Sequence, residues 1–252
     1  STLSPSSAAS DVYKRQVKYY VSGSYMDQDG TLIGSSFNRY SFRTNLDAQL
    51  KSWLKIGLNA TYSSTKDDLK LADSDQGIIS YSLQTVPDIP IYDIDGNYSS
   101  IVREGYTSPN PIAMAMMDQI LLDRQKLTGS IFADVTLMKN LTWHTEFGYD
   151  ISYNKGERYQ PKVDLGNWKR ESNSSSIQKN NSTFWQLKNY VTYSGNIGDK
   201  HHYTAMVGQE CWESSYDFTS VFNSGLPSDE VHNPALGTGC LLYTSPSPRD
   251  IS

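Results

Sequence analysis

The stretch FNRYSFRTNLDAQL, residues 37–50, decides the fold class. Its apolar side chains recur at every second position, and charged or polar groups fill the positions between them. The first set is Tyr40, Phe42, Leu46, Ala48 and Leu50, and the second is Arg39, Ser41, Arg43, Asn45, Asp47 and Gln49. A period of two is the pattern of a β-strand with one apolar and one polar face. The stretch is also long enough for a tilted strand that spans a membrane, which needs about 9–11 residues.

The same alternation recurs along the chain and predicts seven antiparallel strands. They lie near residues 18–25, 37–50, 54–63, 126–137, 141–154, 185–193 and 203–207. Phe132 is an exception, because it falls among the polar positions of its strand.

Short and long connections alternate between these strands. Tight turns are expected at residues 51–53, 138–140 and 195–199, whereas long loops are expected at 27–36, after Ser64 and after Asn154. Short turns at one end and long loops at the other are typical of outer-membrane barrels. The sequence thus favours an all-β, antiparallel, up-and-down transmembrane β-barrel. Complete single-chain bacterial barrels have an even number of strands and at least about eight. Seven strands therefore indicate a fragment of a larger barrel.

The composition agrees with a barrel and excludes a helical membrane protein. Hydrophobic residues make up 37% of the chain, the mean hydropathy is -0.54, and no run approaches the roughly 20 apolar residues of a spanning helix. The 18 Tyr and 5 Trp fit aromatic girdles at the two membrane interfaces. They also fit the general preference of aromatic residues for strands.

No catalytic, metal or cofactor motif is present, and the chain is not expected to be an enzyme. The four histidines do not form an HExxH motif, two cysteines make neither a disulfide framework nor a metal cluster, and a charge of -5 gives no broad basic surface for nucleic acid. Glu146 and Asp150 lie four residues apart on one strand, or about 13 Å, which is too far for a glycosidase pair.

The polar face supplies the candidate lumen residues. They are Arg39, Arg43, Asp47, Glu146 and Asp150. Two interpretations stay open: these side chains contact a plug or line a solute path, or they are generic polar filling of a wide lumen.

The longest loop is expected to hold a short helix, since Ile79, Leu83 and Val86 have helical spacing, with Ser74 as a possible cap and Pro87 as the stop. Tyr92, Tyr98 and Tyr106 are the loop aromatics that could contact a ligand, or pack within the loop.

Two further loop patterns concern turns and mobility. The DxDG sequences at residues 27–30 and 93–96 are read as Asp-Gly turns, because neither continues with the ligands of a calcium loop. The Ser/Asn-rich run 172–182 is expected to be a solvated, mobile tip.

The two ends differ from everything between them. Residues 1–16 and 240–252 are rich in Ser and Pro, carry no strand period, and resemble translated adapter sequence of the kind that contaminates assembled sequencing reads. Residues 17–239 are therefore expected to be the native part, a partial barrel, flanked by two non-native tails. No secretory signal opens the chain, which for an outer-membrane protein indicates truncation.

Several stretches of residues 17–239 resemble the SusC/RagA family of TonB-linked outer-membrane proteins. YYVSGSYMDQDG (19–30) and FNRYSFRTNLDAQLKSWLKIGLNATYS (37–63) resemble early barrel strands of that family. PIYDIDGNY (90–98) and NPIA (110–113) resemble its long extracellular loop, and GLPSDEVHNPALG (225–237) resembles a later loop.

The resemblance implies a parent barrel of about 22 strands with a plugged lumen, embedded in outer-membrane lipid of a Gram-negative cell. It implies import driven by TonB, and a SusD-like lipoprotein that captures oligosaccharides or peptides. The plug and the TonB box are not in this sequence, and no local motif defines a substrate contact.

Two rival interpretations remain open at this stage. One is another outer-membrane barrel, either a siderophore-type TonB-dependent receptor or a passive porin. The other is a soluble all-β adhesion or carbohydrate-binding module, in which a second layer would cover the apolar face.

Overall fold

The computed structural model describes residues 17–70, 77–100, 108–166, 168–197, 201–230, 232–246 and 250–251. The long strands are β1 (Val17–Asp29), β2 (Ser36–Lys51), β3 (Leu54–Leu69), β4 (Gln119–Met138), β5 (Leu141–Gln160), β8 (Ser174–Ile197) and β9 (His201–Ser224). The short ones are β6 (Val163–Leu165), β7 (Trp168–Arg170), β10 (Gly239–Pro246) and β11 (Asp250–Ile251). The helices are α1 (Ile78–Gln84), α2 (Pro111–Met117) and the 3₁₀ helix η1 (Pro234–Leu236).

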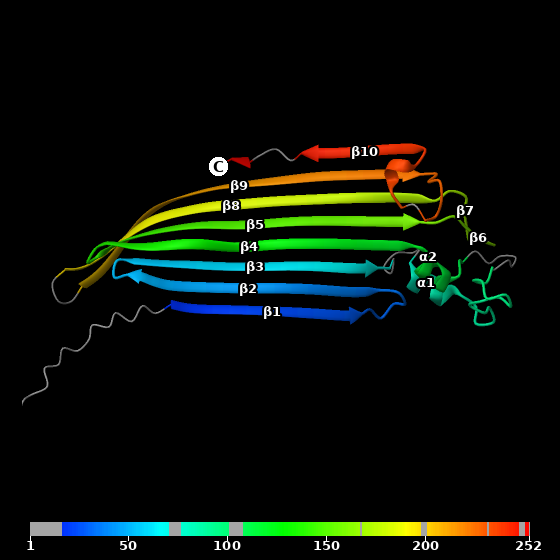
Figure 1. Cartoon of the computed structure of the whole chain (residues 1–252), viewed down its shortest axis with the longest axis horizontal. Coiled ribbons are helices and arrows are strands. Elements are labelled where there is room, and N and C mark those ends of the chain that lie inside the picture. The colour runs from blue at the N-terminus through cyan, green and yellow to red at the C-terminus, as the bar shows by residue number, and fades with distance from the viewer. Residues whose placement is uncertain are drawn as a thin grey trace, which may run out of the picture.

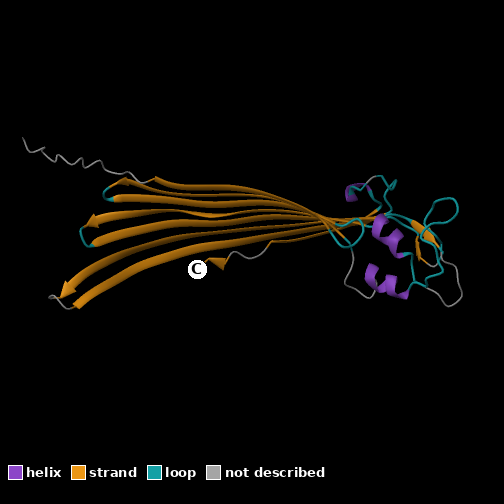
Figure 2. Cartoon of the chain, turned by 90° about the horizontal axis from the view of Figure 1, so that it is seen from below, coloured by secondary structure: helices purple, strands orange, loops and turns teal. Residues whose placement is uncertain are grey.

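The long strands form one antiparallel sheet in which most neighbours in space are neighbours in sequence. Its order is β1-β2-β3-β4-β5-β8-β9-β10, and β11 pairs with β9. Figures 1 and 2 show a single long, twisted layer with the helices gathered at one end. The predicted antiparallel all-β class is confirmed. The sheet is open within the described residues, because β1 and β10 lie at its two edges.

The seven predicted stretches fall on β1 to β5, β8 and β9, but the count of seven is not confirmed, because the sheet has nine strands. The strands are also longer than the sequence indicated, with 24 residues in both β8 and β9. Except for Gly239, strand β10 lies within the predicted non-native tail, and it pairs with β9 from Gly239 opposite Ser224. Whether residues 240–252 are native stays a prediction; residues 1–16 lie outside the described part.

The register carries the alternation from strand to strand. Directly opposite residues in an antiparallel pair share a face, and the pairs Leu46–Leu58, Leu58–Ile131, Ile131–Phe147 and Phe147–Leu187 run in one row across five strands. The neighbouring row, displaced by one residue, is Asn45–Asn59–Ser130–Gly148–Gln186. One face of the sheet is therefore apolar and the other polar; we call them the apolar face and the polar face.

No second layer covers the apolar face in the described part of the chain. Tyr19 and Val207 are 78% exposed, Ile131 is 53% exposed and Phe147 is 42% exposed. The small buried core lies elsewhere, where Ile78 of α1 packs with Met114 and Ala115 of α2, against Tyr81 and Trp168. The helices thus pack on each other and leave the middle of the sheet uncovered, as both views show.

The two ends of the sheet differ as the sequence predicted. At one end, two-residue turns at Ser52–Trp53 and Lys139–Asn140 join β2 to β3 and β4 to β5; the third predicted turn lies partly outside the described residues. At the other end are the segments 30–35, 70–118, 161–173 and 225–238, which contain all of the helices and the β6–β7 hairpin. We call these the turn end and the loop end.

The loop-end elements follow from local sequence signals. Helix α1 is the expected short helix, although it ends at Gln84 before the predicted stop and its N-cap is Gly77; the proposed cap Ser74 lies outside the described residues. Helix α2 was not predicted. Asn110 caps it by accepting hydrogen bonds from the amides of Ile112 and Ala113, with Pro111 at the first helical position.

Two loop predictions are wrong. The DxDG sequence at residues 27–30 is not a turn, because residues 27–29 are the end of β1 and pair with residues 36–38 of β2. The Ser/Asn-rich run 172–182 is not a mobile tip, because residues from Ser174 onward form the start of β8 and pair with both β5 and β9. Polar composition misled the prediction: at this level of the sheet both faces carry polar residues, so a strand no longer shows alternation. The Asp-Gly turn at residues 93–97 is confirmed, since the Asp93 carboxylate accepts hydrogen bonds from the amides of Asp95 and Asn97, and Gly96 has a φ of 84°.

Gly129 of β4 allows β3 and β4 to approach closely. A Cβ at this position would lie 2.2 Å from the backbone oxygen of Asn59 and 2.8 Å from the Tyr149 hydroxyl. Gly148 of β5 is different, since a Cβ there would meet nothing closer than 4.0 Å.

We expect Gly129→Ala to destabilise the sheet, by about 1–3 kcal/mol for an overpacked site. The measurement is the urea midpoint of the intact protein in detergent, followed by heat-modifiable mobility on gels. Gly148→Ala is the matched control and should leave the midpoint almost unchanged. Equal midpoints for the two variants would contradict the close approach at Gly129.

Candidate functional site

The predicted lumen residues all lie on the polar face, but in two separate groups. Arg39, Arg43 and Asp47 follow one another along β2, and Glu146 and Asp150 lie on β5. Strands β3 and β4 separate the groups, which places them about 14 Å apart at 4.8 Å per strand. The structure therefore does not assemble these five residues into one site.

Both carboxylates of the β5 group have polar or basic neighbours on the same face. Asp150 accepts a hydrogen bond from the Thr128 hydroxyl at 3.1 Å and lies 3.0 Å from the ammonium group of Lys126. Glu146 lies 3.8 Å from Nε2 of His144. These contacts hold the carboxylates in place on the sheet surface.

Phe132, the exception to the alternation, belongs to an aromatic row on the polar face. Its ring lies 5.7 Å from that of His144, and His144 stacks on Tyr190 at 4.5 Å. Opposite Phe132 is Gly57, whose missing side chain leaves room for the ring. Nδ1 of His144 lies 2.5 Å from the Asp134 carboxylate. The sequence could not reveal this row, because its members come from three strands.

The structure describes two of the three predicted loop tyrosines. Tyr92 and Tyr98 stack on each other at 5.3 Å across a β-bridge, so each ring covers one face of the other. Tyr92 remains 51% exposed. Tyr106 lies outside the described residues.

The most highly organised part of the loop end is the segment 225–238, which folds against the ends of β5, β8 and β9. Asn173 anchors it: its side-chain amide donates to the Leu226 oxygen at 3.3 Å and to the Asp229 carboxylate at 2.9 Å, and its side-chain oxygen accepts from the Leu226 amide at 2.7 Å. Asn223 provides a second anchor by donating to the Pro234 oxygen at 2.5 Å. Both asparagines are almost completely buried.

A ring contact completes the attachment. The rings of His232 and Tyr159 stack at 3.9 Å, and the Tyr159 hydroxyl donates to the Asp229 carboxylate at 2.7 Å. The hydrogen bonds from Tyr159 and Asn173 lower the pKa of Asp229 below its ordinary value, so this carboxylate stays ionised as an acceptor at neutral pH.

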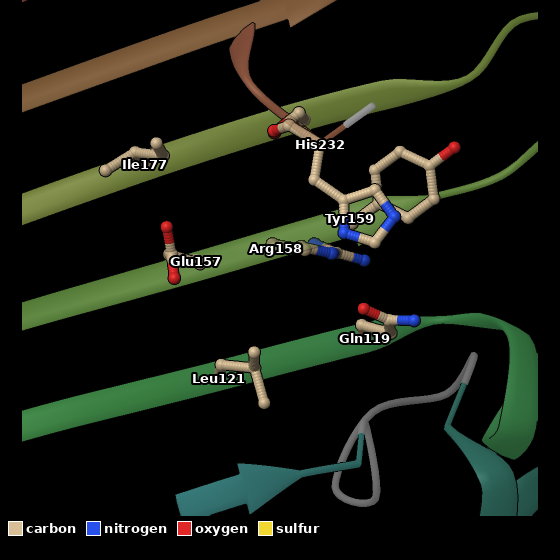
Figure 3. A pocket seen from close by; sticks show the side chains of 8 residues that line it. Gln119, Leu121, Glu157, Arg158, Tyr159, Ile177 and His232 are labelled. Carbon is tan, nitrogen blue, oxygen red and sulfur yellow. The ribbon is translucent and has the colours of Figure 1, made fainter. Parts of the chain in front are cut away.

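These contacts enclose a small pocket at the loop end of the apolar face. It has a volume of about 70 Å³, and Figure 3 shows His232 lying across it above the strands. Its lining residues are Gln119, Leu121, Glu157, Arg158, Tyr159, Ser175, Ile177 and His232. A volume of this size holds water rather than a nutrient, so the pocket marks packing of the loop on the sheet.

Hydrogen bonds also join the end of α2 to β5 and β7. Asp118, which ends α2, receives two hydrogen bonds from the guanidinium group of Arg170, at 2.9 and 3.2 Å. Gln160 at the end of β5 donates to the same carboxylate at 3.0 Å. The loop end is thus a folded platform joined to the strand ends. In the described residues, no helix is long and apolar enough to cross a membrane.

Three curated relatives from Formosa agariphila match most of this chain. The TonB-dependent receptor P26 is 28% identical over 222 residues, or 84% of the chain. P3 and P39, both TonB-dependent receptors, are each 26% identical over 82% of the chain. The chain is similar in sequence to TonB-dependent receptors. It spans only about a fifth of these relatives, 20–21% of their length.

Solved structures agree with this at the level of the fold. The RagAB peptide importer in its closed-closed state matches 91% of the chain with a TM-score of 0.74 and 21% sequence identity. The open-open state matches with a TM-score of 0.75 and 22% identity. In each case the chain covers 27% of the matched chain. No family model matches the sequence. The predicted resemblance to the SusC/RagA family is confirmed, and the relatives are receptors and importers by name.

The loop-end platform depends on Asn173, and we expect Asn173→Ala to release the segment 225–238. The substitution removes three hydrogen bonds and leaves the Leu226 amide without its acceptor, at a cost of about 1–3 kcal/mol for a buried polar group. Hydrogen exchange of residues 225–238 in the intact protein should accelerate, while exchange in β4 and β5 stays the same. Ser172→Ala is the control, because the Ser172 hydroxyl makes only a 3.3 Å contact with the Asn173 oxygen. Unchanged exchange in Asn173→Ala would show that the anchor lies elsewhere.

Proposed function

We propose that the chain is part of the wall of an outer-membrane barrel in a Gram-negative bacterium, and that the parent protein is a TonB-dependent importer. In this proposal residues 17–239 are the barrel segment and the two tails are non-native. With β10 assigned to the non-native tail, the native edges are β1 and β9, and they pair with further strands of a barrel of about 22 strands, since an open edge is not tolerated in lipid.

The uncovered apolar face is the observation that carries the proposal. Large apolar side chains on seven strands are exposed together, whereas soluble monomers rarely expose contiguous apolar patches above a few hundred Å². Acyl chains are the natural cover for such a face, and the polar face behind it then borders a water-filled lumen. The soluble β-module, which needs a second layer on that face, has no support in the described residues.

The orientation follows from the asymmetry of the two ends. Short turns belong on the periplasmic side of such barrels and long loops on the outer side. The folded loop end therefore faces outward in this proposal. There, Tyr92 and Tyr98 are candidates for ligand contact, and Arg39, Arg43, Asp47, Glu146 and Asp150 border the solute path.

No catalytic group is needed for this function. A plug closes the lumen, and work transmitted by TonB opens it, while a SusD-like lipoprotein delivers the cargo. The cargo is an oligosaccharide or a peptide; the RagAB importer, which matches in fold, is named for peptides. A passive porin is the less favoured alternative, because the curated relatives are TonB-dependent receptors.

Import is tested in the bacterium that carries the gene. Wild-type and deletion strains are supplied with defined mixtures of oligopeptides and of oligosaccharides, and depletion of each compound from the medium is followed by mass spectrometry. We expect the deletion strain to lose uptake of a subset of one mixture. Collapse of the protonmotive force with an uncoupler should abolish the same uptake in the wild type, since TonB depends on it. Identical depletion by the two strains, or uptake that persists with the uncoupler, would overturn active import.

A further inference from the structure

The polar face has an open hollow over β1, β2 and β3 that is lined with hydroxyl groups. Its volume is about 530 Å³, and Ser22, Ser24, Arg39, Ser41, Arg43 and Thr61 contribute to its lining. The register places Ser41 between Ser24 and Ser63, and Arg43 between Ser22 and Thr61. Two guanidinium groups thus lie among neutral hydrogen-bonding side chains.

Arg39 and Arg43 have no carboxylate partner among the residues that the structure describes, whereas two other arginines of the chain do. Arg124 is paired with Asp67, and Arg170 with Asp118. Lys126 is likewise paired with Asp150. In the described part of the chain, neither Arg39 nor Arg43 has a carboxylate within ion-pair distance. Among the described residues, the Nε of Arg39 donates a 3.1 Å hydrogen bond to the Ser41 hydroxyl.

The closest acidic residue along β2 does not change this balance. Asp47 follows Arg43 by four positions on the same face, which is about 13 Å along an extended strand. On the β3 side of the hollow, Thr61, Ser63 and Thr65 are neutral, and Asp67, two positions beyond Thr65 on the same face, is paired with Arg124. Neither guanidinium group of the hollow is therefore neutralised by an ion pair among the described residues.

The geometry allows both guanidinium groups to hold one anion. Arg39 and Arg43 flank Ser41 at two positions on either side, about 7 Å each way, and the Nε contact already turns Arg39 toward Ser41. A guanidinium group presents planar donors that match the two oxygens of a carboxylate. Neighbouring serine and threonine hydroxyls can supply further donors to the same group.

We propose that this hollow is a binding site for a carboxylate group of a solute that crosses the lumen. A uronic-acid-containing oligosaccharide and an acidic peptide carry the same group, and both fit the site. That the bound solute is then transported rests on the proposed function; the binding itself does not.

The test uses the intact protein that carries this sequence, purified in detergent, with binding measured by titration calorimetry. The probes are trigalacturonate and the tripeptide Glu-Glu-Glu, with maltotriose and Ala-Ala-Ala as their uncharged counterparts. We expect the wild type to bind at least one acidic probe, more weakly at high salt because the charges are exposed. The double variant Arg39→Gln/Arg43→Gln should raise the Kd of that probe by about tenfold or more, as expected for the loss of charge-assisted hydrogen bonds.

A charge-matched control separates the site from a general field effect. Lys139→Gln/Lys169→Gln removes the same charge at a turn and in β7, outside the hollow, and should leave the affinity within about twofold. Heat-modifiable gel mobility confirms that both variants are folded. Which acidic probe binds identifies the source of the carboxylate. Failure of the wild type to bind either acidic probe, or equal affinities for the two double variants, would overturn the site, whatever the uptake experiment shows.

Discussion

The register between neighbouring strands is the constraint on which the rest of this structure depends. Side chains alternate between the two faces of a sheet, so a slip of one residue moves every side chain of a strand to the opposite face. In the middle of the sheet, from β2 to β8, the row through Leu58 keeps apolar residues opposite apolar ones, and the row through Asn59 holds only polar residues and glycine. A single slipped strand would place a polar stripe among Phe42, Ile131 and Phe147.

The two-faced sheet explains why the folded accessory elements are concentrated at one end. In the proposed barrel the apolar face contacts lipid and cannot be covered by helices, and α1 and α2 pack on each other beyond the strand ends. The segment 225–238 folds onto the apolar face only at its loop end, where Asn173 and Asn223 bind its backbone. Near this level the face itself becomes charged, with Lys66, Asp123, Lys155 and Lys179 opposite one another in one row.

The strands, their faces and the two kinds of connection could be predicted because a period of two is a local property of the sequence. Where the alternation is lost, the sequence predicts the wrong structure: the start of β8 is mostly polar on both faces, which is the composition of a loop. Helix α2 was missed although its cap, Asn110 before Pro111, was readable. The sequence does not predict the network at the loop end, because its members lie up to 73 positions apart, from 159 to 232, and meet only through strand pairing. They are Asn173, Asp229, Tyr159 and His232. The predicted lumen residues share a face, yet their division into a paired group on β5 and an unpaired group on β2 depends on neighbours from other strands.

Leu187 and Gln186 allow the most direct test of the central claim, because they are adjacent in β8 and point to opposite faces. The measurement is the free energy of folding of the intact protein into lipid vesicles, compared for Leu187→Arg and Gln186→Arg. If the apolar face contacts acyl chains and the polar face contacts water, Leu187→Arg should cost about 2–4 kcal/mol and Gln186→Arg at most about 1 kcal/mol. Equal costs for the two substitutions, or the larger cost at Gln186, would contradict the assignment of the faces and with it the membrane-spanning wall.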